Sequence, residues 1–191
     1  MTDYPAVPWR RRMRARDAAE PHRAATPLEL FYDLCFVVAV AAVSHELHHA
    51  ETEGHLAFGL LGYLPVFFTI WWAWMNFTWF ASAYDPDDTP YRLCVLVQIL
   101  GVLILSAGVA PAFAHGDFRA VFAGYVMRIG LETQRLRAAR ADPSGRRTMR
   151  RYVAGESTAL LGWAVVVFTL TGAALTAGFV AMAVVELLVP V

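Results

Sequence analysis

Ionisable side chains lie inside long apolar blocks of this sequence, where each one is costly unless it is paired or hydrated. Glu29 and Asp33 are four residues apart, so a helix would place them on one face. Arg128 and Glu132 have the same spacing in a later block, and Glu156 lies near the start of the block that follows. Carboxylates and a guanidinium in an apolar medium could bind an ion, exchange a proton or simply pair with one another.

A second pattern is typical of zinc enzymes. The segment HELHH at 45–49 fits H-E-x-x-H, in which two histidines one helical turn apart bind zinc and the glutamate acts as a general base. It falls where we expect the first helix to end, near residue 47. A third ligand is required, and Glu51 or His55 could supply it. A His-rich helix end without metal explains the same residues, so a metal site at His45 and His49 is the weaker interpretation.

The apolar blocks themselves indicate a membrane protein. Hydrophobic residues make up 58 % of the chain and charged residues 17 %, and the mean hydropathy is +0.45, which is outside the usual range of soluble domains. An apolar block of about 20 residues is long enough for a helix to cross the hydrocarbon of a bilayer. The sequence therefore predicts an all-α fold, a polytopic transmembrane helix bundle with about six spans.

Local signals divide the chain into elements. Thr26-Pro27 is a helix start, with Thr26 as the cap and Pro27 at the first helical position. Residues 1–26 are basic and predict a cytoplasmic tail, and residues 27–191 form the transmembrane domain. The apolar stretch after Tyr152 is too long for one helix, so we divide it near Thr171-Gly172. The predicted spans are 28–47, 56–80, 92–114, 118–138, 152–170 and 173–190.

Charge is strongly segregated, although the sixteen basic and sixteen acidic residues give a net charge of zero. Beside apolar spans, basic runs mark the cytoplasmic side, and we prefer this explanation to nucleic-acid binding. A cytoplasmic N-terminus puts 48–55 and 115–117 outside and 81–91 and 139–151 inside. Both basic segments then face the cytoplasm, where they can bind anionic lipids. These segments contain Arg10, Arg11, Arg12, Arg14, Arg16 and Arg23, and then Arg135, Arg137, Arg140, Arg146, Arg147, Arg150 and Arg151.

Three stretches resemble a known family. They are ELFYDLCFVVAVAAVSH at 29–45, WWAWMNFTWFASAYDPDDTPYRL at 71–93, and YVMR at 125–128 with the Arg-rich run after it. Together they are similar to the bacterial low-temperature-requirement protein A (LtrA-like) family. The resemblance implies a multi-pass membrane protein and no particular reaction, and it implies that this chain is an N-terminal half. The chain departs from the family pattern at Ala83, Pro86 and Glu132.

The predicted topology gathers the polar residues into one layer in the cytoplasmic half. The leading hypothesis is a transporter or ion-permeation protein with a polar cavity open on that side, in which Asp33 titrates and Arg128 is its countercharge. The structural alternative is that Asp33 pairs with Arg128, Glu29 caps its helix and the Asp-rich loop is solvated. The candidate residues are Glu29, Asp33, Asn76, Asp85, Asp87, Asp88, Arg92, Arg128, Glu132 and Glu156.

Two other functions fit the same sequence. One is a membrane sensor or assembly factor, in which the polar residues only hold helices together and the Arg-rich faces bind anionic lipid or a partner. The other is a membrane zinc hydrolase that uses the segment at 45–49. The acidic turn at 85–88 has ligands that suit a hard cation, but its spacing is not that of an EF-hand. The sequence favours a protein that is not an enzyme, with no cofactor and with a tendency to form homo-oligomers.

Overall fold

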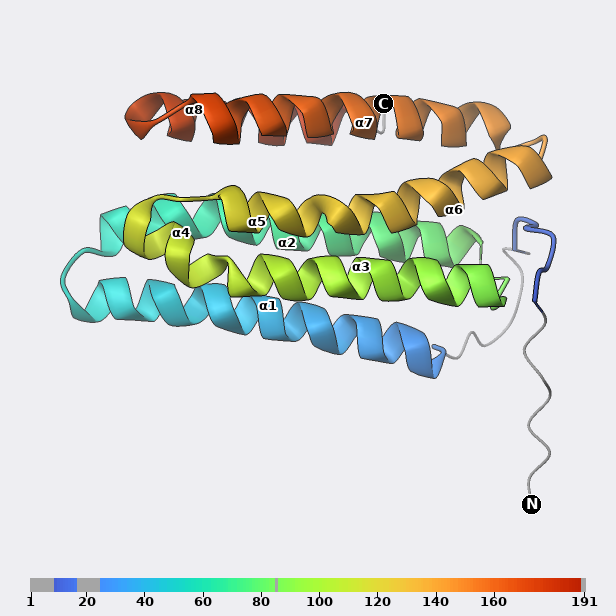
Figure 1. Cartoon of the computed structure of the whole chain (residues 1–191), viewed down its shortest axis with the longest axis horizontal. Coiled ribbons are helices and arrows are strands. Elements are labelled where there is room, and N and C mark those ends of the chain that lie inside the picture. Colours follow the sequence, from blue (N-terminus) through green and yellow to red (C-terminus); the bar gives the residue numbers. More distant parts are fainter. Residues whose placement is uncertain (1–8, 17–24, 85, 190–191) are drawn as a thin grey trace, which may run out of the picture.

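The computed structural model describes residues 9–16, 25–84 and 86–189, and these ranges contain only helices and their connections (Figure 1). The prediction of an all-α fold is confirmed. In chain order the elements are α1 Pro27–Thr52, α2 Leu56–Ala83, α3 Thr89–Ala107, α4 Val109–His115, α5 Arg119–Ala123, the 3-10 turn η1 Gly124–Val126, α6 Met127–Ala141, α7 Arg146–Thr169 and α8 Gly172–Leu188.

The start of α1 forms as its residues predict. Thr26 accepts a hydrogen bond from the Glu29 N–H at 3.2 Å, and the Glu29 carboxylate accepts one from the Thr26 N–H at 3.0 Å. This reciprocal pair is a capping box, and Pro27 occupies the first helical turn. At its other end α1 continues to Thr52, so the expectation that the helix ends near residue 47 is wrong.

The predicted span at 118–138 is not one continuous helix. It consists of α5, η1 and α6, and the break lies where Gly124 meets Gly101 of α3. A Cβ atom on Gly101 would lie 2.5 Å from the carbonyl oxygen of Gly124, and one on Gly124 would lie 2.7 Å from the carbonyl oxygen of Gly101. The two backbones therefore touch, and helix α6 begins directly after this contact.

Four helices of the described chain are long and apolar enough to cross a membrane: α1, α2, the continuous α3–α4 unit and α7. Helix α8 has 17 residues, a length of about 25 Å. It begins after Thr171, where the sequence predicted a boundary. Helix α7 begins at Arg146, before the predicted residue 152. Much of the Arg-rich connection is therefore helical, because arginine is a good helix former.

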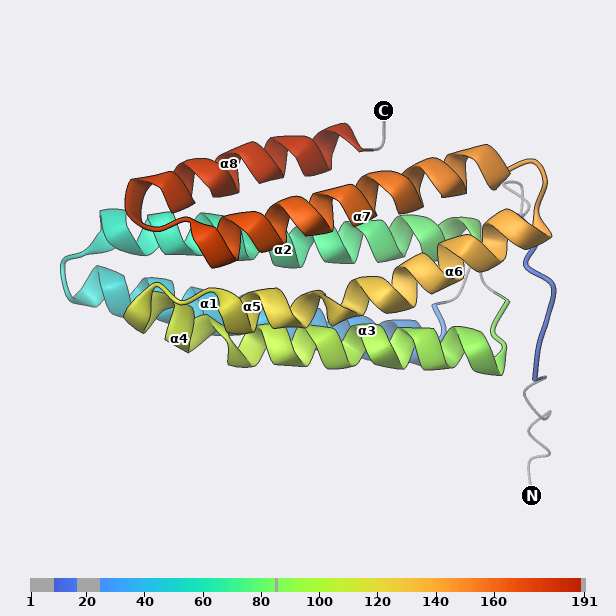
Figure 2. The same cartoon turned by 45° about the horizontal axis from the view of Figure 1, so that its top comes forward.

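The helices run along one common axis, so their connections gather at two ends (Figure 1). The basic end holds residues 9–16, the α2–α3 connection and the α6–α7 connection. The opposite end holds the turns that follow α1, α4 and α7. Helices α1 and α3 lie together on one side, and α2 lies with α5 and α6 in the middle. The α7–α8 hairpin covers this middle layer on its other side (Figure 2).

The outer faces of this bundle are apolar. On α3, Leu93, Leu96, Leu100 and Leu103 are all exposed and form one stripe at helical spacing. Helices α1 and α8 carry similar exposed leucine, valine and phenylalanine side chains, including Leu34, Val37, Val180 and Val184. Extended apolar surface of this kind requires a lipid environment or a partner.

Candidate functional site

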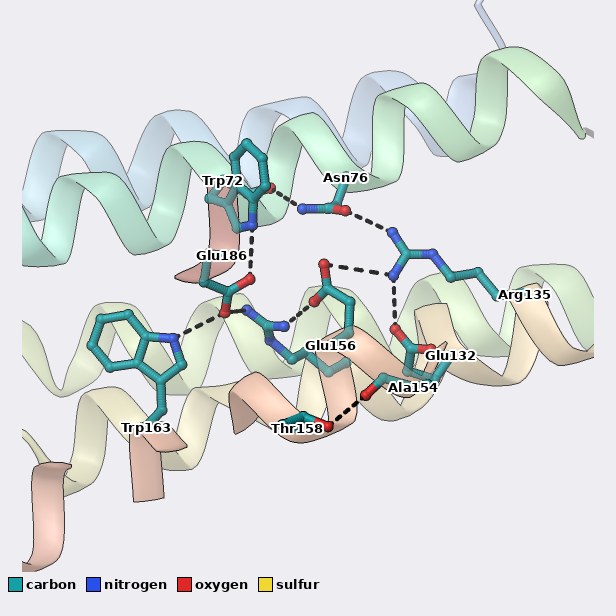
Figure 3. A network of polar contacts seen from close by, with 10 residues as sticks. Trp72, Asn76, Glu132, Arg135, Ala154, Glu156, Thr158, Trp163 and Glu186 are labelled. Atoms are coloured by element: carbon teal, nitrogen blue, oxygen red, sulfur yellow. Dashed lines mark hydrogen bonds and ion pairs between the residues drawn. The ribbon is translucent and has the colours of Figure 1, made fainter. Parts of the chain in front are cut away.

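The interior of the bundle contains a network of charged side chains from α6, α7 and α8 (Figure 3). Arg128, one residue after the start of α6, binds Glu156 of α7 with one guanidinium nitrogen and Glu186 of α8 with another. The three side chains are 12 %, 3 % and 0 % exposed. The guanidinium of Arg128 also lies over the ring of Tyr125, 4.9 Å from its centroid. These charges are thus withdrawn from solvent and paired with one another.

Glu186 is the most completely bound member of the network. Its Oε2 accepts the indole N–H of Trp72 at 2.9 Å, and its Oε1 accepts the indole N–H of Trp163 at 2.9 Å and a guanidinium N–H of Arg128. Glu186 lies near the end of α8, which is shorter than α7 and stops part of the way along it (Figure 2). Because α8 is short, the carboxylate near its end lies in the middle of the bundle.

A second arginine extends the network toward the basic end. Arg135 of α6 is 3 % exposed, and it donates to Asn76 Oδ1 at 2.6 Å and to Glu132 Oε1 at 2.8 Å. Its Nη1 atom is 3.7 Å from Glu156 Oε1, and its guanidinium lies over the ring of Tyr152. Assigning Arg135 to the cytoplasmic Arg-rich connection was therefore wrong. It lies inside α6, which continues to Ala141.

The network is not balanced in formal charge. It contains three carboxylates, Glu132, Glu156 and Glu186, and two guanidinium groups, Arg128 and Arg135. Two carboxylate oxygens, Glu132 Oε2 and Glu156 Oε1, are buried and accept no hydrogen bond from the described residues. Buried polar atoms usually have a partner, so each of these two oxygens has the capacity to accept a further hydrogen bond.

Three separate cavities lie in or near the network and at the opposite end of the bundle. A cavity of about 1000 Å³ opens there, between α2, α4 and the α7–α8 turn. Phe118, Val167 and Phe179 line both this cavity and a smaller one of about 20 Å³, which reaches Tyr125 and Trp163. A further cavity of about 20 Å³ lies among Asn76, Gln98, Arg128 and Glu156. Each small cavity has room for one water molecule.

The large cavity lies at the end opposite to the one where we expected an opening, and the expected opening of the polar layer stays a prediction. We expected the polar layer to open toward the Arg-rich segments, but the largest of these cavities opens at the other end of the helices. Side chains of the polar layer contact one another. Arg135 binds Asn76 and Glu132, and Gln98 donates to Gln134 at 3.3 Å.

Only some of the predicted residues meet in this network. Asn76, Arg128, Glu132 and Glu156 do so. The expected pairing of Asp33 with Arg128 is wrong, because Asp33 Oδ1 accepts the indole N–H of Trp74 at 2.8 Å, whereas Arg128 is bound to α7 and α8. Glu29 caps α1, as the structural alternative expected.

Sequence reasoning missed Glu186, Trp72 and Trp163 as members of the network. For Glu186 a signal was present, since it is the one ionisable residue in the apolar sequence from 157 to 191. For the two tryptophans there was none, because an indole N–H that binds a carboxylate has the same sequence signature as one at the membrane interface.

At the basic end, Asp88 is fully buried and binds three groups. Its Oδ2 accepts from Arg137 at 2.6 Å and from the backbone N–H of Arg11 at 2.8 Å, while its Oδ1 caps α3 by accepting the Tyr91 N–H at 2.9 Å. Burial alone would raise the pKa of Asp88, but Arg137 and the two N–H groups outweigh it and lower that pKa. The expectation of a fully solvated acidic loop is therefore wrong for Asp88.

The other acidic residues of the loop have simpler roles. Asp87 has a φ of 41° and forms a half-exposed ion pair with Arg92, with N–O distances of 2.9 and 3.0 Å. Asp85 lies outside the described residues. Neither Asp87 nor Asp88 reaches the buried network, because each is bound at the start of α3 by other groups.

Residues 9–16, which we call the N-terminal strap, lie across the basic end. The Arg16 N–H donates to the carbonyl of Ala83 at 3.0 Å, and the guanidinium of Arg12 donates to the carbonyl of Ala141. Met13 is 2 % exposed and packs into the main hydrophobic core. The strap therefore joins the ends of α2, α3 and α6. Residues 1–8 and 17–24 of the predicted tail lie outside the described residues.

The histidine motif lies apart from the buried network. His45 and His49 lie on α1 near the opposite end, and His49 Nδ1 is 3.5 Å from Glu53 in an exposed pair. Within the described part of the chain, no three His, Cys, Asp or Glu side chains converge in a way that could hold a metal ion. No third ligand for the motif is found among those residues.

The helices and the buried charges together define an integral membrane protein, a helical bundle with a polar interior. The chain belongs to the family described as bacterial low temperature requirement A protein (LtrA), whose model matches residues 24–191. Membership of this family, which the sequence predicted, is confirmed, while the idea of an N-terminal half stays a prediction. No curated protein and no solved structure matches the chain.

Proposed function

We propose that this chain is a transport or ion-permeation protein of the bacterial cytoplasmic membrane and that its path passes through the buried network. One observation carries the proposal. Arg128, Glu156 and Glu186 form an ion-paired triad in the bundle interior, and two cavities lie between it and the opposite end of the bundle. Ionisable groups at such depth are typical of ion and proton pathways.

A purely structural role explains the triad less well. Well-packed apolar residues often stabilise a protein as much as a buried ion pair does, or more, because the ion pair must first be desolvated. Three buried carboxylates and two buried arginines must all be desolvated, and apolar contacts between the same four helices would avoid this cost in free energy. A pathway, in contrast, needs groups that can exchange charge with water, and the cavity beside Glu156 has polar side chains in its wall and room for one such water.

The orientation that we propose follows from the strap. Arg10, Arg11 and Arg12 lie at the same end of the bundle as Arg137 and the start of α7. Arginine-rich segments are retained on the cytoplasmic side. The N-terminus is then cytoplasmic, and the large cavity opens to the other side of the membrane.

The test is flux through liposomes reconstituted with the purified chain, with gradients of protons, potassium and sodium. We expect flux in the wild type and its loss in Glu156→Gln and in Glu186→Gln. Glu53→Gln is the matched control, because Glu53 is exposed at a helix end. Asp33→Asn should keep its flux, since Asp33 is bound to Trp74 outside the network. The absence of flux in a folded wild type under all these gradients would refute the transport function.

A second candidate function has its own observation. Arg10, Arg11, Arg12 and Arg137 line a cavity of about 280 Å³ at the basic end. Asp88, which accepts the backbone N–H of Arg11, is already bound by three donors. The cavity could bind the phosphate of an anionic lipid, as a membrane sensor or assembly factor would require. Thermal stability in anionic and in zwitterionic lipid, compared between wild type and Arg12→Gln, tests this function.

A further inference from the structure

The unbalanced charge of the buried network has a chemical consequence. With every group ionised, Glu132, Glu156 and Glu186 carry three negative charges and Arg128 and Arg135 carry two positive ones. An uncompensated charge inside a membrane is strongly unfavourable. One more positive charge must therefore be bound in the network.

The contacts of Glu132 and Glu156 indicate where the additional positive charge is bound. Glu132 and Glu156 both approach the same nitrogen, Arg135 Nη1, at 2.8 and 3.7 Å. Each also has one buried oxygen without a hydrogen-bond donor among the described residues, Oε2 in Glu132 and Oε1 in Glu156. A protonated carboxyl supplies an O–H donor, which an ionised pair lacks.

The third carboxylate is an unsuitable place for a proton. Both oxygens of Glu186 accept N–H groups, from Trp72, Trp163 and Arg128. An O–H on either oxygen would compete with these donors. The missing charge therefore belongs at the other end of the network, beside Arg135.

Among the residues that the structure describes, the remaining groups around the pair supply no further charge. Helix α2 contributes Asn76 and α3 contributes Gln98, both neutral. The titratable groups of the neighbouring elements are the phenols of Tyr32 on α1, Tyr125 in η1 and Tyr152 on α7. A neutral phenol does not balance a carboxylate, so the count of three against two stands.

We propose that Glu132 and Glu156 share one proton and that the proton is the species the network binds and passes. This inference rests on the proposed transport function and names its substrate. A metal cation would have to enter beside two guanidinium groups, which repel it, whereas a proton lies on the carboxyl itself. The cavity at Glu156 can hold a single water, to which the proton can move.

Infrared spectroscopy of the purified full chain tests the proposal directly, because a protonated carboxyl absorbs apart from a carboxylate. The protein is studied at neutral pH in a detergent without ester groups, with and without ¹³C-labelled glutamate to identify the band. We expect a protonated-glutamate band in the wild type and its loss in Glu132→Gln, in which two carboxylates face two arginines. In Arg135→Gln three carboxylates face one arginine, so the band should roughly double.

The outcomes decide between the alternatives. A folded wild type without the band overturns the proposal, and so does a band that persists in both Glu132→Gln and Glu156→Gln. A wild type that sodium or potassium stabilises, when Glu156→Gln is not stabilised, means that a metal cation is bound instead of a proton. If Arg135→Gln does not fold, the loss of the band in Glu132→Gln still decides, and Glu53→Gln is the control.

This experiment is separable from the test of transport. The band and proton flux are measured on the same preparation. A band without any flux supports the shared proton and refutes the proposed transport function. Proton flux without the band supports transport and overturns the shared proton.

Discussion

Trp72 on α2 donates its indole N–H to Glu186 on α8 at 2.9 Å, across 114 residues of sequence. Both side chains are buried, so the bond joins the final helix to the middle of the bundle. Trp163 of α7 donates to the same carboxylate. The α7–α8 hairpin is thereby fixed to α2 by a charged group that an apolar surface cannot replace without loss of these bonds.

Trp72→Phe should destabilise the protein by about 1–3 kcal/mol, because it removes one donor and leaves Glu186 Oε2 buried without it. The free energy of unfolding, measured in mixed micelles, checks this value. Trp79→Phe is the matched control, since Trp79 is 46 % exposed and the described residues show no acceptor for its indole. Equal losses in the two variants would mean that ring packing, not the hydrogen bond, determines the stability.

Arg128→Gln should be more severe, at about 3–5 kcal/mol, because two buried carboxylates lose their shared countercharge. The same unfolding measurement applies. Arg119→Gln removes an exposed arginine whose pair with Asp117 is 3.9 Å long, and it should change stability by less than about 1 kcal/mol. A mild effect of Arg128→Gln would show that the triad is hydrated in the membrane.

The first helix shows what the sequence could predict. Thr26, Pro27 and Glu29 interact within three residues, so the pattern that forms the cap is contained in the local sequence. The split of the last apolar stretch at Thr171-Gly172 was also predictable, because span length requires it. Whether a segment is a helix, and where most of the helices begin and end, depends on such short-range information.

The network depends on contacts over long range. Arg128 binds residues 28 and 58 positions further along the chain, and helical spacing says nothing about which helix faces it. A pairing with Asp33 had the right charges, but α7 packs against α6, α8 packs against α7 and α2, and these two helices supply the carboxylates that bind Arg128. Asp88 was misjudged for a similar reason, since its burial depends on a strap 77 residues earlier.

Asp88→Asn should loosen the N-terminal strap. The amide can still cap α3, but it loses the charge that binds Arg137 and the Arg11 N–H. A loss of about 1–2 kcal/mol would increase the open fraction of the strap about 5–30-fold. Trypsin cleavage after Arg10, Arg11 or Arg12 in the folded protein, followed by mass spectrometry, measures this fraction. Asp87→Asn is the control, because Asp87 pairs with Arg92, and equal cleavage of the two variants would refute the role of Asp88.

The contact between Tyr84 and Asp142 should depend on pH at both extremes. The Tyr84 hydroxyl donates to Asp142 at 2.7 Å and joins the end of α2 to the α6–α7 connection. Burial first, and then this bond, raise the pKa of Tyr84 to about 12, whereas hydrogen bonds from Ser144 and Tyr84 lower the pKa of Asp142 to about 2. Folding therefore favours the neutral phenol and the ionised carboxylate.

The directions of these two pKa shifts define the pH range in which the contact stabilises the fold. The ionised carboxylate of Asp142 contributes fully to the stability of the fold above its ordinary pKa of 3.8. This contribution is lost as the pH falls to about 2. The phenol contributes fully below its ordinary pKa of 10.0, and its contribution is lost as the pH rises to about 12. In Asp142→Asn the pKa of Tyr84 should fall below about 12 yet stay above 10.0, because burial remains.

Phenolate absorbance measures this shift, with Tyr84→Phe identifying the contribution of Tyr84. Asp117→Asn, at the opposite end of the bundle, should leave the titration unchanged. If Tyr84 titrates at the same pH in Asp142→Asn as in the wild type, the hydrogen bond does not persist in the membrane-embedded protein.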